Sequence, residues 1–274
     1  MFKLMAAHVI TDEHLDKLRY PILVTPKMNG IRVVKYRGAL YTRQGLKVEN
    51  RFLQARYASI PDGFEGELIA GFTFSETSGI VRSVEAVPVE YSLVLFDNLS
   101  AFDKPYASRM EDINEYVYSF FHCVNVSFCI STECFRAEQV RELYENALKQ
   151  PYPSGEGLIL RDPHAFYKEG RSTITEQALL KMKRSTTAIA EVMSKTALVQ
   201  NGKEQSAVGS FSCSSKDFAR PFKLGSGFTH EERVHLWRAC GVGDRIEFEY
   251  FEKSNLGAPL HPRFKSVVNP SITK

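Results

Sequence analysis

The sequence predicts two domains, an α+β domain of antiparallel sheets with flanking helices over residues 1–186 and a small all-β barrel over residues 187–274. Three observations support this division. The chain has 274 residues, enough to bury two hydrophobic cores. Up to about residue 185, strand-like runs alternate with helical periodicity. Beyond it, short strands are separated by turns such as Asn201-Gly202 and Gly225-Ser226-Gly227.

The elements of the first domain follow from local patterns. Apolar and β-branched runs predict strands at 21–24, 31–36, 40–42, 64–69, 91–97, 125–131, 155–160 and 179–184. Capping residues and helical spacing predict helices at 11–18, 50–59, within 73–86, and at 108–121 and 136–150. A polar loop is expected at 167–173. In the second domain we expect strands near 222–224, 245–250 and 260–265, with a short helix after residue 228.

The composition describes an ordinary globular protein, with 43% hydrophobic and 24% charged residues. Five cysteines form no Cys-x-x-Cys pair, which argues against a structural zinc site and for free thiols in a reducing compartment. No run approaches the roughly 20 apolar residues that span a bilayer, and the start resembles no leader, so we expect a cytoplasmic protein, in a host cytoplasm if phage-encoded. After residue 185 there are 12 Lys and Arg against 9 Asp and Glu, a weak basic bias that suits a polyanion partner.

A lysine stands between two apolar runs in Thr25-Pro26-Lys27-Met28-Asn29-Gly30-Ile31-Arg32. Asn29-Gly30 predicts a tight turn with positive φ angles, which would place Lys27 on a strand-to-strand connection. A solvated surface lysine is the simpler interpretation of such a turn. As a nucleophile, a lysine needs help, because a pKa of roughly 10.4 leaves on the order of one molecule in a thousand neutral near pH 7.5. Neighbouring cations or partial burial would lower that pKa.

Later segments can supply such surroundings. Glu67 and Glu156 each follow or precede a glycine on a buried-looking strand, which lets a ligand approach the backbone closely. Strand alternation places Lys181 and Lys183 on one face, opposite Leu180 and Met182.

Taken in order, these segments resemble the motifs of the covalent nucleotidyltransferase superfamily, and most closely those of small ATP-dependent DNA ligases of phage or viral type. Lys27-Met28-Asn29-Gly30 is similar to Lys-x-Asp-Gly, with asparagine for aspartate. Thr42-Arg43-Gln44-Gly45 is similar to Ser-Arg-x-Gly, with threonine for serine. The remaining motifs are matched by Glu65-Gly66-Glu67-Leu68, Leu95-Phe96-Asp97, Glu156-Gly157-Leu158-Ile159 and Leu180-Lys181-Met182-Lys183. The resemblance covers essentially the whole chain.

The resemblance implies a nucleotidyltransferase (adenylation) domain followed by an oligonucleotide-binding (OB) fold. It implies an ATP-dependent ligase that seals 3′-hydroxyl/5′-phosphate nicks in duplex DNA through a lysyl-AMP intermediate and an adenylated 5′ end. The catalytic residues would be Lys27, Glu156, Lys181 and Lys183. ATP would be held by Thr25, Lys27, Arg32, Glu67, Phe96, Lys181 and Lys183. Mg²⁺, or Mn²⁺ in its place, would be bound by Glu156 and Glu67. DNA would be contacted by Asn29, Arg43, Arg171, Arg263 and Lys265.

The sequence departs from the family at its end. The basic motif Arg-x-Asp-Lys, which orients the leaving pyrophosphate, is missing from 263–270, and the resemblance leaves Arg263 and Lys265 as the nearest substitutes. Two other functions stay open. One is an RNA ligase or an mRNA-capping-type nucleotidyltransferase, and the other is a non-catalytic OB-fold protein that binds nucleic acid. We expect a monomer without an obligate protein partner.

Overall fold

The computed structural model describes residues 3–119, 125–184, 186–200, 202–250, 253–254, 256–259 and 262–269. The chain forms two compact units, Met1–Lys183 and Arg184–Lys274. The boundary expected after residue 186 falls at the start of strand β13 (Thr186–Gln200). In the described part of the chain, none of the helices has the length and apolar character needed to cross a membrane.

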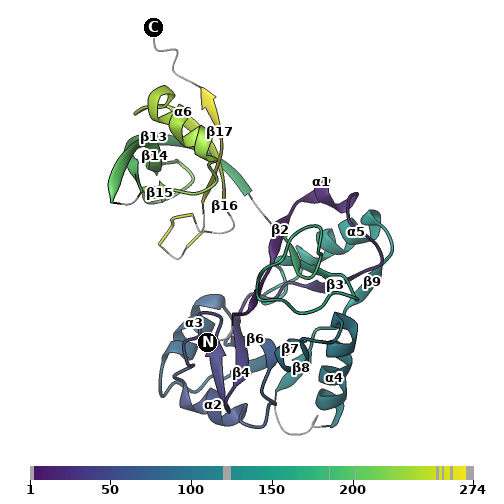
Figure 1. The fold of residues 1–274 in the computed structure, drawn as a ribbon. Coiled ribbons are helices and arrows are strands. Elements are labelled where there is room, and N and C mark those ends of the chain that lie inside the picture. The colour runs from purple at the N-terminus through teal and green to yellow at the C-terminus, as the bar shows by residue number, and fades with distance from the viewer. Residues whose placement is uncertain are drawn as a thin grey trace. The chain divides into compact units, whose positions relative to one another are not determined.

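Two five-stranded sheets make up most of the first unit (Figure 1). One sheet has the order β5 (Ala39–Thr42), β4 (Ile31–Tyr36), β6 (Phe64–Ala70), β7 (Tyr91–Asn98) and β8 (Val126–Phe128). Its core is closed by α2 (Arg51–Arg56), α3 (Phe74–Arg82) and α4 (Tyr106–Ser119). Leu53, Val81 and Ile113 from these helices pack on buried strand residues such as Leu68 and Leu95. Helices cover one face, so the opposite face of the strands is available to line a site.

The other sheet has the order β2 (His8–Ile10), β12 (Leu180–Lys183), β10 (Gly157–Arg161), β3 (Ile22–Pro26) and β9 (Thr132–Cys134). Its core includes Leu15 of α1 (Asp12–Leu15) and Val140 of α5 (Ala137–Ala147). A two-stranded ladder joins β1 (Met5–Ala6) to β11 (Gly170–Arg171), and a short 3-10 helix, η1 (Leu99–Ala101), follows β7. The alternation predicted for β12 is confirmed, because Leu180 and Met182 are buried while Lys181 and Lys183 lie on the open face.

Three sequence-based expectations need correction. The sheets are not purely antiparallel, since within the described ranges β1–β11, β2–β12 and β7–β8 are parallel pairs. The polar loop expected at 167–173 contains the short strand β11. The segment with Lys27 does connect two strands, but not through a tight turn, because β3 and β4 belong to different sheets and residues 27–30 cross from one to the other.

Close backbone packing explains why residue 30 of the crossing segment is a glycine. Neither Asn29 nor Gly30 has a positive φ, so the turn geometry predicted for this pair is wrong. A Cβ atom on Gly30 would lie 2.6 Å from the carbonyl oxygen of Leu68. Glycine is therefore required here by the close approach of two backbones rather than by the left-handed conformation.

The second unit is one five-stranded antiparallel sheet with a single helix among its described residues. The order is β15 (Phe222–Leu224), β14 (Lys203–Ser214), β13, β16 (Arg245–Tyr250) and β17 (Arg263–Asn269), and α6 is His230–Ala239. The backbone N–H of Phe264 in β17 donates to the carbonyl of Ser226, just after β15, at 2.9 Å. The rings of Phe228 and Phe264 stack with centroids 4.6 Å apart. The two edges of the sheet thus meet around a shared core, which makes the predicted barrel.

Asn50 provides a test of how the first sheet is anchored. Its side chain accepts from Leu53 N–H to cap α2, and its amide donates to three carbonyls, those of Ile80, Ser83 and Ala86. Asn50→Asp keeps the cap but removes the donor and buries a carboxylate beside carbonyl oxygens, so we expect the free energy of unfolding to fall by about 3 kcal/mol. Urea denaturation followed by circular dichroism measures this. Asn146→Asp, at an exposed position, should change it by less than about 0.5 kcal/mol; equal effects would contradict the anchoring role.

Candidate nucleotide-binding site

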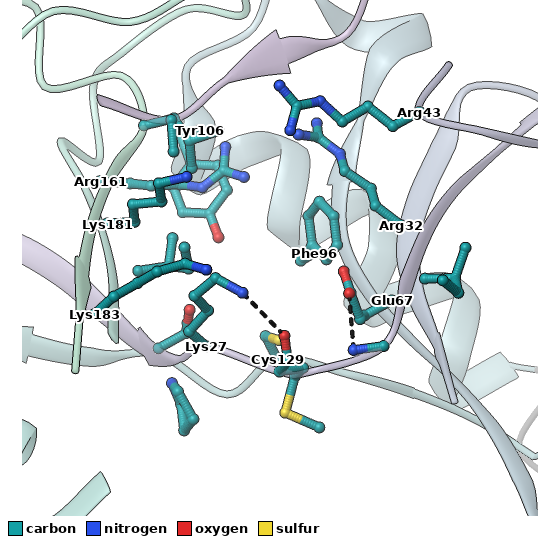
Figure 2. Close-up of a pocket in the computed structure, with 18 of the residues that line it drawn as sticks. Lys27, Arg32, Arg43, Glu67, Phe96, Tyr106, Cys129, Arg161, Lys181 and Lys183 are labelled. Carbon is teal, nitrogen blue, oxygen red and sulfur yellow. Dashed lines mark hydrogen bonds between the residues drawn. The ribbon is translucent and has the colours of Figure 1, made fainter. Parts of the chain in front are cut away.

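A cavity of about 330 Å³ opens in the first unit and is lined by residues of both sheets (Figure 2). Its walls include eight of the residues singled out from the sequence, namely Thr25, Lys27, Arg32, Arg43, Glu67, Phe96, Lys181 and Lys183. These residues come from segments up to 158 positions apart, between Thr25 and Lys183. The structure therefore brings together in one pocket the side chains that the sequence pattern assigned to nucleotide binding.

One wall of the pocket is formed by three residues that are paired across neighbouring strands. Thr25 of β3 faces Ile159 of β10, and Ile159 faces Lys181 of β12, so the three side chains lie side by side on one face of the sheet. Burial, together with the nearby charges of Lys183, Lys27 and Arg43, lowers the pKa of Lys181 to about 8. A buried cation beside other cations favours a ligand that carries negative charge.

Lys27 is fixed at the end of β3 by its backbone and by its amine. Its N–H donates to the carbonyl of Gly157 at 2.8 Å, which extends the β3–β10 pairing by one residue. Its Nζ forms an ion pair with Glu156 and lies 3.3 Å from the carbonyl oxygen of Met28. The side chain is only 18% exposed. The interpretation of Lys27 as a solvated surface lysine is thus wrong.

Glu156 holds two amines at once. One carboxylate oxygen pairs with Lys27 and the other with Lys183. Burial by itself raises the pKa of Glu156, but the charges and hydrogen bonds of Lys27 and Lys183 outweigh it and keep the pKa below the ordinary value. The resemblance assigned Glu156 to catalysis and metal binding, and it did not predict this pairing of the carboxylate with two lysines.

Arg32 is held from two sides by a buried network. Its Nε donates to Glu65 at 3.1 Å and its Nη2 pairs with the same carboxylate, while Nη1 donates to the carbonyl of Met5 at 2.6 Å. Tyr167 donates its hydroxyl to the other oxygen of Glu65 and accepts from the N–H of Met5 at 3.0 Å. The network ties β1, β4 and β6 together and leaves the guanidinium of Arg32 against the ring of Phe96, 5.3 Å from its centroid.

Glu67 lies on the same face of β6 as Glu65. It accepts from the N–H of Gly30 at 3.1 Å, and burial raises its pKa to about 7. The negative charge of Glu156 raises the pKa of Glu67 as well, because the two carboxylates repel one another. Among the described residues no cluster of three or more His, Cys, Asp or Glu is found. Two carboxylates do fit a magnesium ion that takes its remaining ligands from water and phosphate oxygens.

Phe96 owes its position to an irregularity in β7. Glu65 pairs with Asp97 and Gly66 pairs with Leu95, so Phe96 is the extra residue of a β-bulge. Bulges redirect a side chain locally, and here Phe96 points into the cavity while Asp97 is fully buried. The sequence identified Phe96 as a pocket residue, but no sequence pattern predicted the bulge that places it there.

The residues expected to contact DNA are spread over both units. Arg43 lines the cavity, and its N–H donates to the carbonyl of Arg32 at 3.2 Å. Asn29 is half-buried beside the pocket, where its N–H donates to Pro153 O at 2.8 Å, and Arg171 is exposed on β11. Arg263 and Lys265 lie on β17 of the second unit, each 3.6 Å from a carboxylate oxygen of Glu249.

Sequence reasoning missed five residues of the site. Glu65 was quoted only as part of a motif, although alternation with Glu67 could have placed it on the same face. Tyr106, Cys129, Arg161 and Gln44 also line the cavity. Gln44 adjoins the predicted Arg43, and Arg161 follows the Glu156 segment, so proximity in sequence was a weak signal for both. Nothing in the sequence distinguishes Tyr106 or Cys129 from ordinary core residues.

Comparisons with known proteins agree with this geometry. A family model for the DNA ligase OB-like domain matches residues 201–267. Among solved structures, the chain is similar to the adenylate form of a Chlorella virus DNA ligase, with 28% identity over 97% of this chain and 99% of that chain and a TM-score of 0.60. It is also similar to a Lig E DNA ligase, with 25% identity, the same coverage and a TM-score of 0.78. A search of curated proteins found no match.

A third structure shares the fold. It is the ATP-dependent DNA ligase of bacteriophage T7 in complex with ATP, 18% identical over 97% of this chain and 98% of that chain, with a TM-score of 0.52. These matches confirm the predicted fold class, a nucleotidyltransferase domain followed by an OB fold. They also confirm the resemblance to minimal ATP-dependent DNA ligases.

The pKa of Lys181 gives a testable pH dependence. Lys181 is charged below about pH 8 and loses its proton above it, so its attraction for a triphosphate is present at low pH and fades as pH rises through that value. We expect the affinity for ATP, measured by isothermal titration calorimetry from about pH 6.5 to 9.5, to fall on the alkaline side. Lys181→Arg should move this fall to higher pH, because a guanidinium stays protonated. Lys168→Arg, at an exposed ion pair, should leave the profile unchanged, and an unchanged profile in Lys181→Arg would contradict the assignment.

Proposed function

We propose that this protein is an ATP-dependent DNA ligase that seals nicks with a 3′-hydroxyl and a 5′-phosphate in duplex DNA. The observation that carries the proposal is the position of Lys27, a nearly buried amine beside Lys181 and Lys183 in a cavity of nucleotide size. The similarity to DNA ligases over 97% of the chain supports it. A protein that only binds nucleic acid has no need of such a pocket.

In the first step, Nζ of Lys27 attacks the α-phosphorus of ATP. A phosphorus–nitrogen bond forms, the bond to the bridging oxygen of pyrophosphate breaks, and the amine releases a proton to solvent. Glu156 pairs with Lys27 in the free protein, so this contact has to loosen before the amine can attack. Negative charge grows on the α-phosphate oxygens, and Lys181 and Lys183 are placed to stabilise it.

Two further displacements complete the reaction. The 5′-phosphate of the nick attacks the lysyl-AMP phosphorus, which releases the lysine and leaves an adenylated 5′ end. The 3′-hydroxyl then attacks the 5′-phosphate, the new phosphodiester bond forms, and AMP departs. The first two displacements occur at the AMP phosphorus, and the third expels AMP from the 5′-phosphate. Lys181 and Lys183, beside the AMP phosphate, would stabilise the negative charge on its oxygens in all three steps.

The rest of the pocket holds and orients the nucleotide. Phe96 would stack on the adenine, and Arg32 and Glu67 would hold the ribose, with Arg32 kept in place by Glu65. Glu156 and Glu67 would bind Mg²⁺, which would supply charge neutralisation at the phosphates. Thr25 stands beside Ile159 on the pocket wall and would contact the nucleotide there.

DNA binding would use cations from both units. Arg43 would take the 5′-phosphate, and Asn29, Arg171, Arg263 and Lys265 would contact the duplex around the nick, since phosphate contacts dominate such binding. We propose that the enzyme acts as a cytoplasmic monomer on nicked duplex.

The nearest alternatives share the lysine chemistry. An RNA ligase would use ATP but seal RNA, and a capping-type enzyme would use GTP. Incubation with labelled ATP or GTP, followed by nicked DNA or nicked RNA, separates the three. We expect label from ATP and sealing of DNA. Label from GTP alone, or sealing of RNA alone, would replace the proposed function.

Lys27 variants test the nucleophile. We expect the intact mass of the protein to rise by one AMP after incubation with ATP and Mg²⁺, and both Lys27→Ala and Lys27→Arg to lose this gain. The arginine variant keeps the positive charge but cannot attack, because its guanidinium stays protonated. Lys168→Arg should retain the gain. An adduct on either Lys27 variant would show that another residue is the nucleophile.

Lys265 tests the replacement for the missing pyrophosphate motif. A cation that contacts only pyrophosphate helps the first step and no later one, since pyrophosphate has already left. We expect Lys265→Ala to slow lysyl-AMP formation while sparing the sealing of a pre-adenylated nick. Two single-turnover rates measure this, one with ATP and one with pre-adenylated nicked duplex. Arg238→Ala, the loss of an exposed cation on α6, is the matched control. Equal slowing of both steps in Lys265→Ala would make the residue a DNA contact or a structural one.

A further inference from the structure

The two ends of the pocket are lined by different kinds of side chain. Strand β10 begins just after Glu156 and ends at Arg161, so these residues stand about 16 Å apart at roughly 3.3 Å per residue. The amines that suit phosphates gather at the Glu156 end. Around Arg161 the cavity is lined instead by Phe96, Tyr106 and Cys129. An end lined by two aromatic rings suits the base of a nucleotide rather than its phosphates.

Arg161 is held in a fixed orientation at this end. The residue is 2% exposed, its Nη1 donates to Asp97 at 2.5 Å, and its guanidinium lies 4.4 Å from the ring centroid of Tyr106. Asp97 is in turn held by Arg109 Nε at 2.7 Å and by the N–H of Asn98 at 2.8 Å. Figure 2 shows the guanidinium directed from β10 toward Phe96. Asp97, which binds Arg161, directly follows Phe96, the bulge residue of β7. The same part of β7 therefore positions both the ring of Phe96 and the guanidinium of Arg161.

The remaining donors of Arg161 have no hydrogen-bond acceptor among the described residues. A guanidinium carries five N–H groups, and in the described part of the chain Asp97 is the one hydrogen-bond acceptor found for Arg161. Fully buried nitrogen without a partner occurs at Arg109 Nη2 but not at Arg161, so the free N–H groups of Arg161 reach the cavity. Two arginines share the single charge of Asp97, which leaves an excess positive charge at this end. N–H groups that reach the cavity can donate to a ligand that carries acceptors.

We propose that Arg161 helps to bind the base by donating a hydrogen bond to a ring nitrogen of adenine stacked on Phe96. The inference rests on the proposed function, which makes ATP the nucleotide. The exocyclic amino group of adenine offers only donors and cannot pair with a guanidinium. The ring nitrogens N1, N3 and N7 are acceptors, and each can be replaced by a C–H group without changing the shape of the base. Asp97 and Arg109 are positioning residues that hold Arg161 in the orientation for this contact.

The first measurement uses the intact wild-type protein. We expect one of 1-deaza-, 3-deaza- and 7-deaza-ATP to form the lysyl adduct with kcat/KM lowered about tenfold or more relative to ATP, because a hydrogen bond from a charged donor is typically worth at least that factor. The other two analogues should stay within about twofold of ATP. All three analogues within about twofold of ATP would overturn the proposal without any mutant.

The second measurement assigns the contact to Arg161. In Arg161→Met, Asp97 keeps Arg109 as a partner, so the buried carboxylate is not left unpaired. We expect this variant to react with ATP more slowly and to lose the penalty for the sensitive analogue, which then matches ATP within about twofold. Arg141→Met, which removes surface ion pairs to Asp12 and Asp16, should keep both the ATP rate and the penalty. A penalty of equal size in Arg161→Met would place the contact on another group and overturn the proposal.

The outcomes separate this inference from the function itself. If the wild type forms no adduct with ATP, the proposed function fails and the base contact falls with it. If the adduct forms but the analogues behave as ATP does, the ligase proposal stands and the role of Arg161 is wrong. Circular dichroism of Arg161→Met confirms folding before its rates are compared. Should the variant fail to fold, the wild-type analogue series can still overturn the proposal.

Discussion

The double ion pair of Glu156 organises the pocket of the first unit. One carboxylate joins the ends of three neighbouring strands, because Lys27 follows β3, Glu156 precedes β10 and Lys183 ends β12. Without it, two amines would face each other in a partly buried site, and their repulsion would favour a wider arrangement. The same contact occupies Nζ of Lys27. Ligand phosphates would compete with Glu156 for both amines, so filling the pocket also frees the nucleophile.

Elsewhere in the first unit, buried charged groups also share one carboxylate between two partners. Arg32 shares Glu65 with the hydroxyl of Tyr167, and Arg161 shares Asp97 with Arg109. Such networks cost desolvation, and removing one member leaves another charge buried without a partner. Their value here is geometric, since each fixes a cation against the ring of Phe96 or beside it. The pocket is therefore shaped by ion pairs that lie behind its walls as much as by the residues that face the ligand.

The second unit is stabilised differently. Its core is aromatic, with Phe218, Phe222 and Phe248 packed in tilted and edge-on pairs, and its helix is tied to the barrel by lysine and arginine side chains. Lys195 donates to the carbonyls of Trp237 and Cys240, and Arg233 donates to those of Val208 and Gly209. These cations are used for structure. The cations left for a polyanion are those at the surface, such as Arg263 and Lys265, which Glu249 holds only loosely at 3.6 Å.

Much of this protein can be predicted from the sequence because the relevant forces are local. Strand alternation put Lys181 and Lys183 on one face, helical spacing found the helices to within a few residues, and the order of short motifs gave the fold class and most of the pocket. What the sequence did not determine depends on partners distant along the chain. The crossing of 27–30 between two sheets, the bulge at Phe96 and the pairing of Lys27 with Glu156 each require contacts between separate strands. Local patterns indicate which face of a strand a residue occupies. Only the tertiary structure decides which charged group lies beside it, as Glu156 does for Lys27 and Asp97 for Arg161.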